Sequence, residues 1–548
     1  MQKTIVIVGA ALSGPTAAAR ARELDESARI ILIERNTRVS YALAGLSLHL
    51  SGEVANLDDL NREREDFFRS VYNIEVLTRT EVISIDAAGK KVEIQTPSGR
   101  ETVNYTSLIY AAGAASLEPS GAAGASNHCV FRTLDDLEKI SGVLKSGKKR
   151  FVILGGGPMG IEAADGLVRA GAEVTIVERS RRVLPLFSTL FSSLAEETLA
   201  RKMRILTGAE SDSFEIQNGQ IVSVSAKFAE DRSEKVETDF VISCTGVRPR
   251  TEILGNAGAN LAADGSVIID EYCRTSLPDV FACGVGVHLP ERDGARFLPQ
   301  AAAADRTAQA AGANAAGASV RLENLAGAML LRLPADHGEE IGRTGLSLRE
   351  AKDMGKDASR VIVHVMDREA YMPGAAPVIL QLIFEKGSGR ILGLEGIGPG
   401  LARRLDTASA AIAGGLSIHK LAGLDSAYHP SSGAVRDALM VAATVASQAE
   451  RGQTRFVEVA DISKKPGEYL ILDAGKKADG SVHLHIPLED LRGRLTEVKQ
   501  ALEKSQARRV AVLSETGRRG HLAERILAHN GIEAVNIQGG RRLFGRSV

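Results

Sequence analysis

Apolar runs alternate with alanine-rich amphipathic segments in two stretches of the first half of the chain. Residues 4–8 (TIVIV) predict a buried strand, which is followed by a glycine-bearing turn, a helix at 15–26 and a second apolar strand at 28–36. The same pattern returns at 150–180, where RFVILGGGPMG is followed by a predicted helix at 161–171 and the strand AEVTIVERS. Two strand–helix–strand units with glycine turns predict two dinucleotide-binding folds in one chain.

The pattern changes in the second half. The segment PVILQLIFEKGSGRILGLEGIG (377–398) predicts two strands joined by a turn, and alanine-rich helices follow it. The polar stretch EVADISKKPGE (458–468) predicts a linker, and a small α/β pattern begins near residue 469. The fold class is therefore α/β: two three-layer Rossmann-type domains, a mixed α+β domain and a C-terminal α/β domain.

Size and composition narrow the class of protein. A chain of 548 residues is too long for one hydrophobic core. The 67 basic and 68 acidic residues nearly cancel, which argues against a nucleic-acid partner. No apolar run reaches membrane-spanning length, and the four cysteines are scattered without a CxxC pair. We therefore expect a cytoplasmic protein with reduced thiols, no membrane span and no metal site.

The first glycine turn is GAALSG, residues 9–14. Gly9 makes the tight turn, Gly14 allows close packing of helix and strand, and the helix start at Leu12 and Ser13 offers free amides to a pyrophosphate. Glu34 ends the second strand, where a carboxylate can bind an adenosine ribose, and Arg35 follows it.

The second turn, GGGPMG, keeps the full fingerprint spacing. Its candidate binding residues are Gly155, Gly157, Met159 and Gly160. Glu178 ends the strand of this unit and favours NADH, because a 2′-phosphate would meet its negative charge. NADPH stays open as the alternative, since three arginines follow at positions 179, 181 and 182.

Further segments carry a family resemblance over nearly the whole chain. YAAGAA (110–115), CTGVRPRTEI (244–253), RTGLSLREAK (343–352), AYMPGAAPV (370–378) and LDSAYHPSSG (424–433) resemble segments of the CoA-disulfide reductase, persulfide reductase and NADH oxidase group of flavoprotein disulfide reductases, in the version with a C-terminal rhodanese domain. The resemblance implies a homodimer with FAD in the first site and NAD(P)H in the second. It also implies four domains: FAD-binding (1–118 plus 246–324), NAD(P)H-binding (119–245), dimerisation (325–450) and rhodanese-like (460–548).

The resemblance assigns individual roles as well. Glu162 matches the family residue near the nicotinamide–flavin contact and is assigned a catalytic role with Tyr371 and Tyr428. Tyr371 matches a segment of the dimerisation domain, and Tyr428 matches the segment that reaches over the partner's active site. Matches to further cofactor-binding positions are Ala112, Gly113, Gly246, Gly284 and Val285. Arg20, Arg22 and Ser40 match CoA-binding positions, although a solvated helix face is an equal alternative for the two arginines.

Three departures from the family change the expected chemistry. SYALAGLS places Ala44 at the redox cysteine, FACGVG places Val285 at the aspartate that binds the flavin ribityl chain, and VAVLSETGRRG places Ser514 at the rhodanese cysteine. Alanine and serine cannot form thiolates or persulfides. The leading hypothesis is an FAD enzyme that passes electrons from NAD(P)H to a quinone, dioxygen, a carrier protein or a CoA-linked substrate.

Two alternatives remain. A non-catalytic nucleotide- or CoA-binding subunit of a larger complex would fit the loss of the aspartate at Val285. A disulfide or persulfide reductase with a displaced thiol would need another cysteine, and Cys283, one residue before the GVG turn, is the first candidate.

Overall fold

The computed structural model describes residues 2–61, 63–289, 296–297, 300–323, 325–335, 338–465, 467–477 and 482–543. The chain forms two compact units, one of residues 1–184 and 199–327 and the other of residues 185–198 and 328–548.

The first unit contains the two predicted Rossmann-type sheets, both fully parallel. One has the order β19-β7-β1-β2-β3, with strands Val280–Ala282, Ser107–Tyr110, Thr4–Val8, Arg29–Ile33 and Ile74–Leu77. The other has the order β12-β11-β10-β16-β9, with strands Arg204–Thr207, Glu173–Glu178, Arg150–Leu154, Phe240–Ser243 and His128–Val130. Their strands are buried on both faces, which explains the continuous apolar runs in the sequence.

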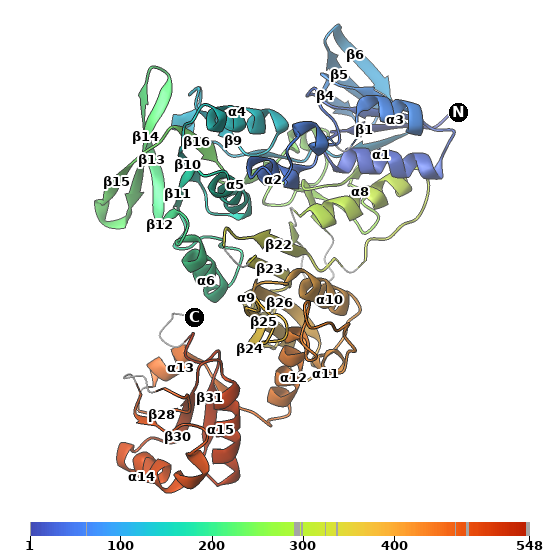
Figure 1. Ribbon diagram of the computed structural model, residues 1–548. Coiled ribbons are helices and arrows are strands. Elements are labelled where there is room, and N and C mark those ends of the chain that lie inside the picture. The colour runs from blue at the N-terminus through green and yellow to red at the C-terminus, as the bar shows by residue number, and fades with distance from the viewer. Residues whose placement is uncertain are drawn as a thin grey trace. The chain divides into compact units, whose positions relative to one another are not determined.

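Helices cover both sheets. Helix α1 (Ser13–Leu24) lies against α8 (Ala301–Ala315) beside the first sheet (Figure 1), so closely that a Cβ on Gly312 would lie 2.3 Å from the carbonyl oxygen of Ala17. Helix α4 (Leu134–Lys145) and helix α5 (Pro158–Arg169) accompany the second sheet. Three-stranded antiparallel sheets extend each fold: β4-β5-β6 (Glu81–Asp86, Lys91–Thr96, Gly99–Asn104) and β13-β14-β15 (Ala209–Gln217, Gln220–Phe228, Ser233–Glu237).

The second unit has two sheets of different type. Strands Ala328–Arg332, Glu340–Gly345, Ile391–Gly398, Pro377–Glu385 and Ala358–Met366 form the antiparallel sheet β22-β23-β26-β25-β24. It packs against α10 (Ala402–Ala413) and α12 (Ala438–Glu450), and α11 (Ile418–Ala422) contacts α12. The hairpin predicted at 377–398 is confirmed as β25 and β26.

The C-terminal sheet is parallel, in the order β27-β31-β30-β28-β29. Its strands are Phe456–Val457, Ala534–Ile537, Arg509–Leu513, Tyr469–Asp473 and Leu484–His485, and its main helices are α14 (Leu495–Ser505) and α15 (Arg518–His529). The linker expected at 458–468 is wrong in one respect, because it contains helix α13 (Val459–Lys464).

Strands β11 and β12 belong to the first unit, but most of the residues between them belong to the second. Segment 185–198, which contains all but the last residue of α6 (Thr189–Leu199), clusters with the second unit. The backbone N–H of Ser188 donates to the buried carboxylate of Glu395 at 3.2 Å, and Arg343 donates to the carbonyl oxygen of Leu186. Among the described residues, no helix combines the length and apolar character needed to cross a membrane.

Candidate active site

The first glycine turn is built for close backbone approach. Gly9 has φ +96°, and a Cβ there would lie 2.4 Å from the carbonyl oxygen of Ala111; a Cβ on Gly14 would lie 1.8 Å from the carbonyl oxygen of Gly9. No side chain caps the start of α1 at Leu12 and Ser13. The free amides and the positive end of the helix dipole therefore suit a pyrophosphate.

Glu34 follows β2 and braces this turn. One carboxylate oxygen accepts the Ala10 N–H at 2.8 Å, and the other accepts the Asn36 backbone N–H at 2.9 Å. The carboxylate is 8% exposed, and its remaining lone pairs can accept ribose hydroxyls. The side chain of Arg35 is exposed, 3.9 Å from Glu81.

The second glycine turn repeats the arrangement. Gly155 has φ +101°, and a Cβ there would lie 2.3 Å from the carbonyl oxygen of Cys244, while a Cβ on Gly160 would lie 2.0 Å from the carbonyl oxygen of Gly155. A Cβ on Gly157, by contrast, would meet no described atom within 4 Å. No side chain caps α5, which starts at Pro158 beside the half-buried Met159. This open helix start fits a second dinucleotide.

Glu178 stabilises the second glycine turn in the same way that Glu34 stabilises the first, by accepting backbone N–H groups. Its carboxylate accepts the N–H groups of Gly156 and Ser180, each at 2.6 Å, and is 8% exposed. A negative charge held this firmly beside the ribose position repels a 2′-phosphate, which supports the predicted preference for NADH.

The turn expected to meet the flavin ribityl chain lies beside the first glycine turn. Gly284 has φ +88°, and a Cβ there would lie 2.7 Å from Ser13 Oγ; its N–H donates to Thr307 Oγ1 at 3.0 Å. A Val285 methyl carbon lies 3.8 Å from where a Cβ on Gly113 would be. Val285 thus occupies the family's position without a polar atom. The neighbouring candidates are the half-buried Ala112 and Gly246, whose φ is +121°.

Two arginines near this site are not among the candidates that the sequence motifs identify. Burial lowers the pKa of both Arg132 and Arg250, and among the described residues neither guanidinium forms an ion pair. Arg250 is anchored at the site because its backbone N–H donates to the carbonyl oxygen of Gly113 at 2.9 Å. Desolvated arginines outside any ion pair suit a bound anion, and with the first glycine cradle they fit FAD. Neither arginine belongs to a short motif, so only the fold reveals them.

Ala44 and Glu162 lie on two helical segments that pack together. Ala44 is exposed in the 3₁₀ turn Leu43–Gly45, directly before α2 (Leu46–Leu50). Helix α2 contacts α5 closely, since a Cβ on Gly166 would lie 2.7 Å from the carbonyl oxygen of Ser47. Burial, and secondarily the charge of Asp165, raises the pKa of Glu162 to about 7. Its carboxyl group therefore exchanges a proton near neutral pH.

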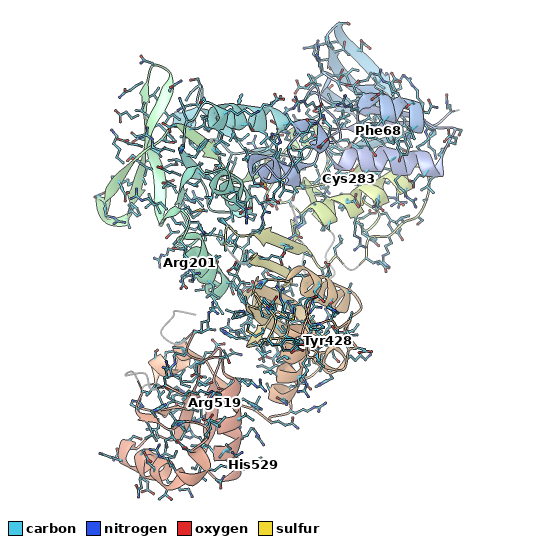
Figure 2. The ribbon with its side chains drawn as sticks, viewed as in Figure 1. Phe68, Arg201, Cys283, Tyr428, Arg519 and His529 are labelled. Carbon is cyan, nitrogen blue, oxygen red and sulfur yellow. The ribbon has the colours of Figure 1, made fainter. Side chains whose placement is uncertain are left out.

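None of the four cysteines has the properties of a reactive thiol. All are reduced, and burial raises the pKa of each, that of Cys244 and Cys283 to about 12. Figure 2 shows Cys283 beside α8, and it is 1% exposed. An inaccessible thiol that stays protonated is a poor nucleophile, which disfavours the displaced-cysteine alternative.

The proposed CoA-contacting residues differ in their surroundings. Arg22 is 5% exposed and donates to four backbone carbonyl oxygens, those of Asp25, Glu26, Tyr72 and Asn73, at 2.7–3.0 Å. It is neither on a solvated helix face, as the alternative supposed, nor free for a phosphate. Arg20 pairs with Glu23 at 2.7 Å on the surface, and Ser40 is buried with φ +52°.

In the second unit, Tyr371 and Tyr428 are exposed side chains, at 71% and 48% (Figure 2 labels Tyr428). The structure brings them together, because the Tyr371 and Glu369 side chains lie close enough to the Tyr428 phenol to act on its pKa. Desolvation first, and then the proximity of Tyr371 and Glu369, raises the pKa of Tyr428.

The loop at Ser514 is closed on itself. Ser514 is fully buried, and its Oγ accepts the N–H groups of Gly517 at 3.1 Å and Gly520 at 3.0 Å. Arg519, labelled in Figure 2, donates to the carbonyl oxygen of Ala474 and pairs with Glu489. Two amides of the loop, those of Gly517 and Gly520, and the Arg519 guanidinium are thus already bonded within the domain.

Comparison with known proteins agrees with this geometry. The family model of the pyridine nucleotide-disulphide oxidoreductases matches residues 3–308, and that of their dimerisation domain matches residues 338–439. The chain belongs to the pyridine nucleotide-disulphide oxidoreductase family. This oxidoreductase is 26% identical to an NADH oxidase of Enterococcus faecalis over 78% of the chain and 95% of that relative. It is 27% identical to the NAD(P)H coenzyme A polysulfide/persulfide reductase of Pyrococcus horikoshii over 81% of the chain and 98% of that relative.

Solved structures extend the likeness to the C-terminal domain. The reduced Bacillus anthracis CoADR-RHD has a TM-score of 0.92 at 25% identity, covering 100% of this chain and 98% of the other. The NAD-dependent persulfide reductase from A. fulgidus has a TM-score of 0.89 at 28% identity, covering 98% and 99%. The expected fold class is confirmed.

Proposed function

We propose that this oxidoreductase uses FAD and NAD(P)H, with NADH preferred, and delivers electrons to an acceptor that is not a disulfide. The observation that carries the proposal is the combination of two intact glycine cradles with Ala44 at the redox position. FAD, when bound, supplies the chemistry that links a two-electron hydride donor to the acceptor. The residues of the chain bind and orient the reactants.

Glu162 has the clearest role in that orientation. The family resemblance puts it near the nicotinamide–flavin contact, and its carboxyl group holds a proton up to about pH 7. In the protonated form it can donate a hydrogen bond through its O–H and accept one at its carbonyl oxygen. We propose that it positions the nicotinamide for hydride transfer.

The dimerisation-domain match supports a homodimer. In that assembly Tyr371 and Tyr428 would face the partner's acceptor site, with two phenol groups as hydrogen-bond donors. A quinone, dioxygen, a carrier protein and a CoA-linked substrate are the acceptor classes. The commitment of Arg22 to backbone carbonyl groups weakens the case for CoA. The C-terminal domain is proposed to be rhodanese-like in fold and inactive in sulfur transfer, because Ser514 cannot carry sulfane sulfur.

The visible spectrum of the purified protein tests the proposal. Bound flavin that is bleached by NADH under anaerobic conditions is the expected result. A colourless protein that stays colourless after incubation with FAD would refute it. Val285 favours the second candidate, a non-catalytic nucleotide-binding subunit, and that outcome would support it.

A further inference from the structure

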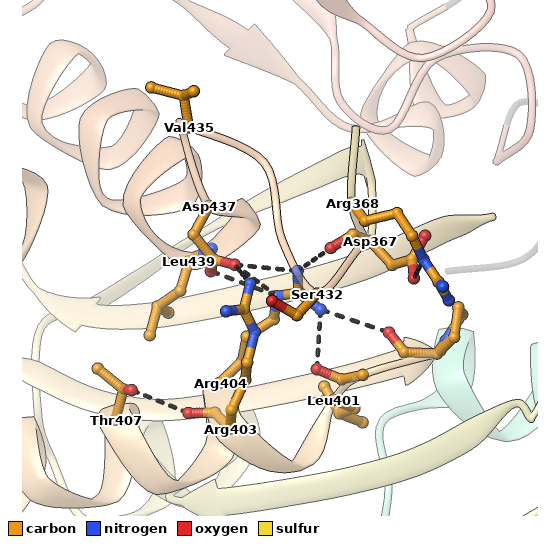
Figure 3. Close-up of polar contacts among 12 residues, drawn as sticks. Asp367, Arg368, Leu401, Arg403, Arg404, Thr407, Ser432, Val435, Asp437 and Leu439 are labelled. Atoms are coloured by element: carbon orange, nitrogen blue, oxygen red, sulfur yellow. Dashed lines mark hydrogen bonds and ion pairs between the residues drawn. The ribbon is translucent and has the colours of Figure 1, made fainter. Parts of the chain in front are cut away.

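Two loops of the dimerisation domain carry the exposed tyrosines. The 367–376 loop joins β24 to β25 and contains Tyr371; the 423–437 loop joins α11 to α12 and contains Tyr428. The loops are far apart in sequence, yet Figure 3 shows polar contacts that join them around one buried guanidinium.

That guanidinium belongs to Arg404 of α10, which is 1% exposed. Its Nη2 donates to the carbonyl oxygen of Asp367 at 2.7 Å and to the Asp437 carboxylate at 2.9 Å. Its Nη1 donates to the carbonyl oxygen of Gly400 at 2.8 Å. One side chain therefore holds the first residue of one loop and the last residue of the other.

Asp437 extends the junction. Its carboxylate also accepts the Leu439 N–H at 3.0 Å, capping α12, and pairs with Arg403. It is 4% exposed. A planar guanidinium and a carboxylate fix direction as well as distance, which apolar side chains of the same volume would not do.

Contacts between the loops continue toward their tips. Arg368 Nη1 donates to the carbonyl oxygen of Ser431 at 3.4 Å, and the Glu369 carboxylate accepts the Val435 N–H at 3.1 Å. Glu369 and Tyr371 are also the side chains whose proximity, after desolvation, raises the pKa of the Tyr428 phenol. Hydrogen bonds thus join the two loops at their ends through Arg404 and again at Ser431 and Val435, on either side of the tyrosine pair.

We infer that Arg404 and Asp437 are positioning residues that set the relative placement of Tyr371 and Tyr428 and thereby the affinity for the electron acceptor. Neither residue touches the acceptor itself. The inference rests on the proposed function, in which the tyrosine pair meets the acceptor.

The test compares Arg404→Lys and Asp437→Asn with Arg343→Lys as the matched control. Lysine keeps the charge of Arg404 but loses the planar fork that reaches both loops. Arg343 is also a buried arginine of this domain, but it pairs with Glu350 and contacts neither loop. Menadione serves as the acceptor probe with the flavin-loaded dimer.

We expect the KM for menadione to rise between about 5- and 100-fold in the two loop variants, while the rate of anaerobic reduction by NADH stays within about twofold. A purely structural defect would lower both, and Arg343→Lys should change neither. Equal losses in both half-reactions, or the same KM effect in Arg343→Lys, would overturn the inference.

A second measurement does not depend on the flavin. The protein has eight tyrosines, so ¹³Cζ-tyrosine NMR can follow Tyr428, with Tyr428→Phe assigning its signal. We expect the phenol pKa of Tyr428 to fall toward its ordinary value in Arg404→Lys, because its contacts with Tyr371 and Glu369 are lost. An unchanged titration would refute the positioning role even in an active enzyme. A shifted titration in a colourless protein would support positioning while refuting the proposed function.

Discussion

Replacing Glu162 with glutamine tests the electrostatics of the candidate active site. The pKa of this carboxyl group is raised from 4.5 to about 7, mainly by burial. At 1.36 kcal/mol per pKa unit, keeping the ionised form in the folded protein costs roughly 3 kcal/mol. Glutamine has nearly the same shape and no ionisable proton, so it should remove this cost without leaving a cavity.

The sign of the pH dependence follows from the direction of the shift. Between about pH 4.5 and pH 7 the unfolded chain releases a proton that the folded protein keeps, so the contribution of Glu162 to stability falls as pH rises through this window. The stability difference between Glu162→Gln and the native protein should therefore grow from near zero at about pH 4 to roughly 3 kcal/mol in favour of the variant at about pH 8.

Calorimetry of the transition that unfolds the second nucleotide fold, across this pH range, measures the difference. The exposed Glu173 on the neighbouring strand provides a control, because Glu173→Gln should leave the pH dependence unchanged. The rate of reduction by NADH should lose its inflection near pH 7 in Glu162→Gln. Parallel stability curves for the native protein and this variant would show that Glu162 does not titrate as inferred.

Further outcomes are expected at the cofactor site, the redox position and the C-terminal domain. NADH should give a higher kcat/KM than NADPH, and Glu178→Ala should narrow the difference; equal or better use of NADPH would show that the arginines beyond β11 dominate. Anaerobic titration with dithionite should consume about two electrons per flavin, whereas about four would reveal a second redox group. The Ala44→Cys variant should show a thiolate charge-transfer band if the site keeps the family geometry. Ser514→Ala should destabilise the C-terminal domain by about 1–3 kcal/mol, because the buried N–H of Gly520 and the half-buried N–H of Gly517 lose their acceptor, and an unchanged melting transition would contradict the closed loop.

The Rossmann-type units could be located from the sequence because their signals are local. Apolar runs, glycine turns and terminal glutamates lie within about 30 residues in each unit, and the strands begin at Thr4 and Arg150 as predicted. The hairpin at 377–398 also depends on neighbouring residues alone. Such short-range patterns determine backbone conformation directly.

Contacts between distant segments could not be predicted in this way. The sequence alone suggests that Arg22 lies on the surface of α1. In the folded chain it is buried, because it donates hydrogen bonds to the carbonyl oxygens of Tyr72 and Asn73. Arg132 and Arg250 are separated by more than a hundred residues, and Arg404 meets Asp367 and Asp437 only in the folded domain. A single sequence without its fold does not show which charges become buried.

The loop at Ser514 in the C-terminal domain is stabilised by its own side chain. Ser514 Oγ accepts the N–H groups of Gly517 and Gly520. Other residues of the domain contact Arg360 on β24 of the antiparallel sheet. The Glu458 carboxylate accepts hydrogen bonds from Nη2 and Nε of Arg360, at 2.8 and 3.0 Å, and Gln538 donates to the carbonyl oxygen of Arg360. Because a bidentate arginine–carboxylate pair fixes orientation, these contacts hold the C-terminal domain to the antiparallel sheet of the second unit. The domain is thus best understood as part of the scaffold of the second unit.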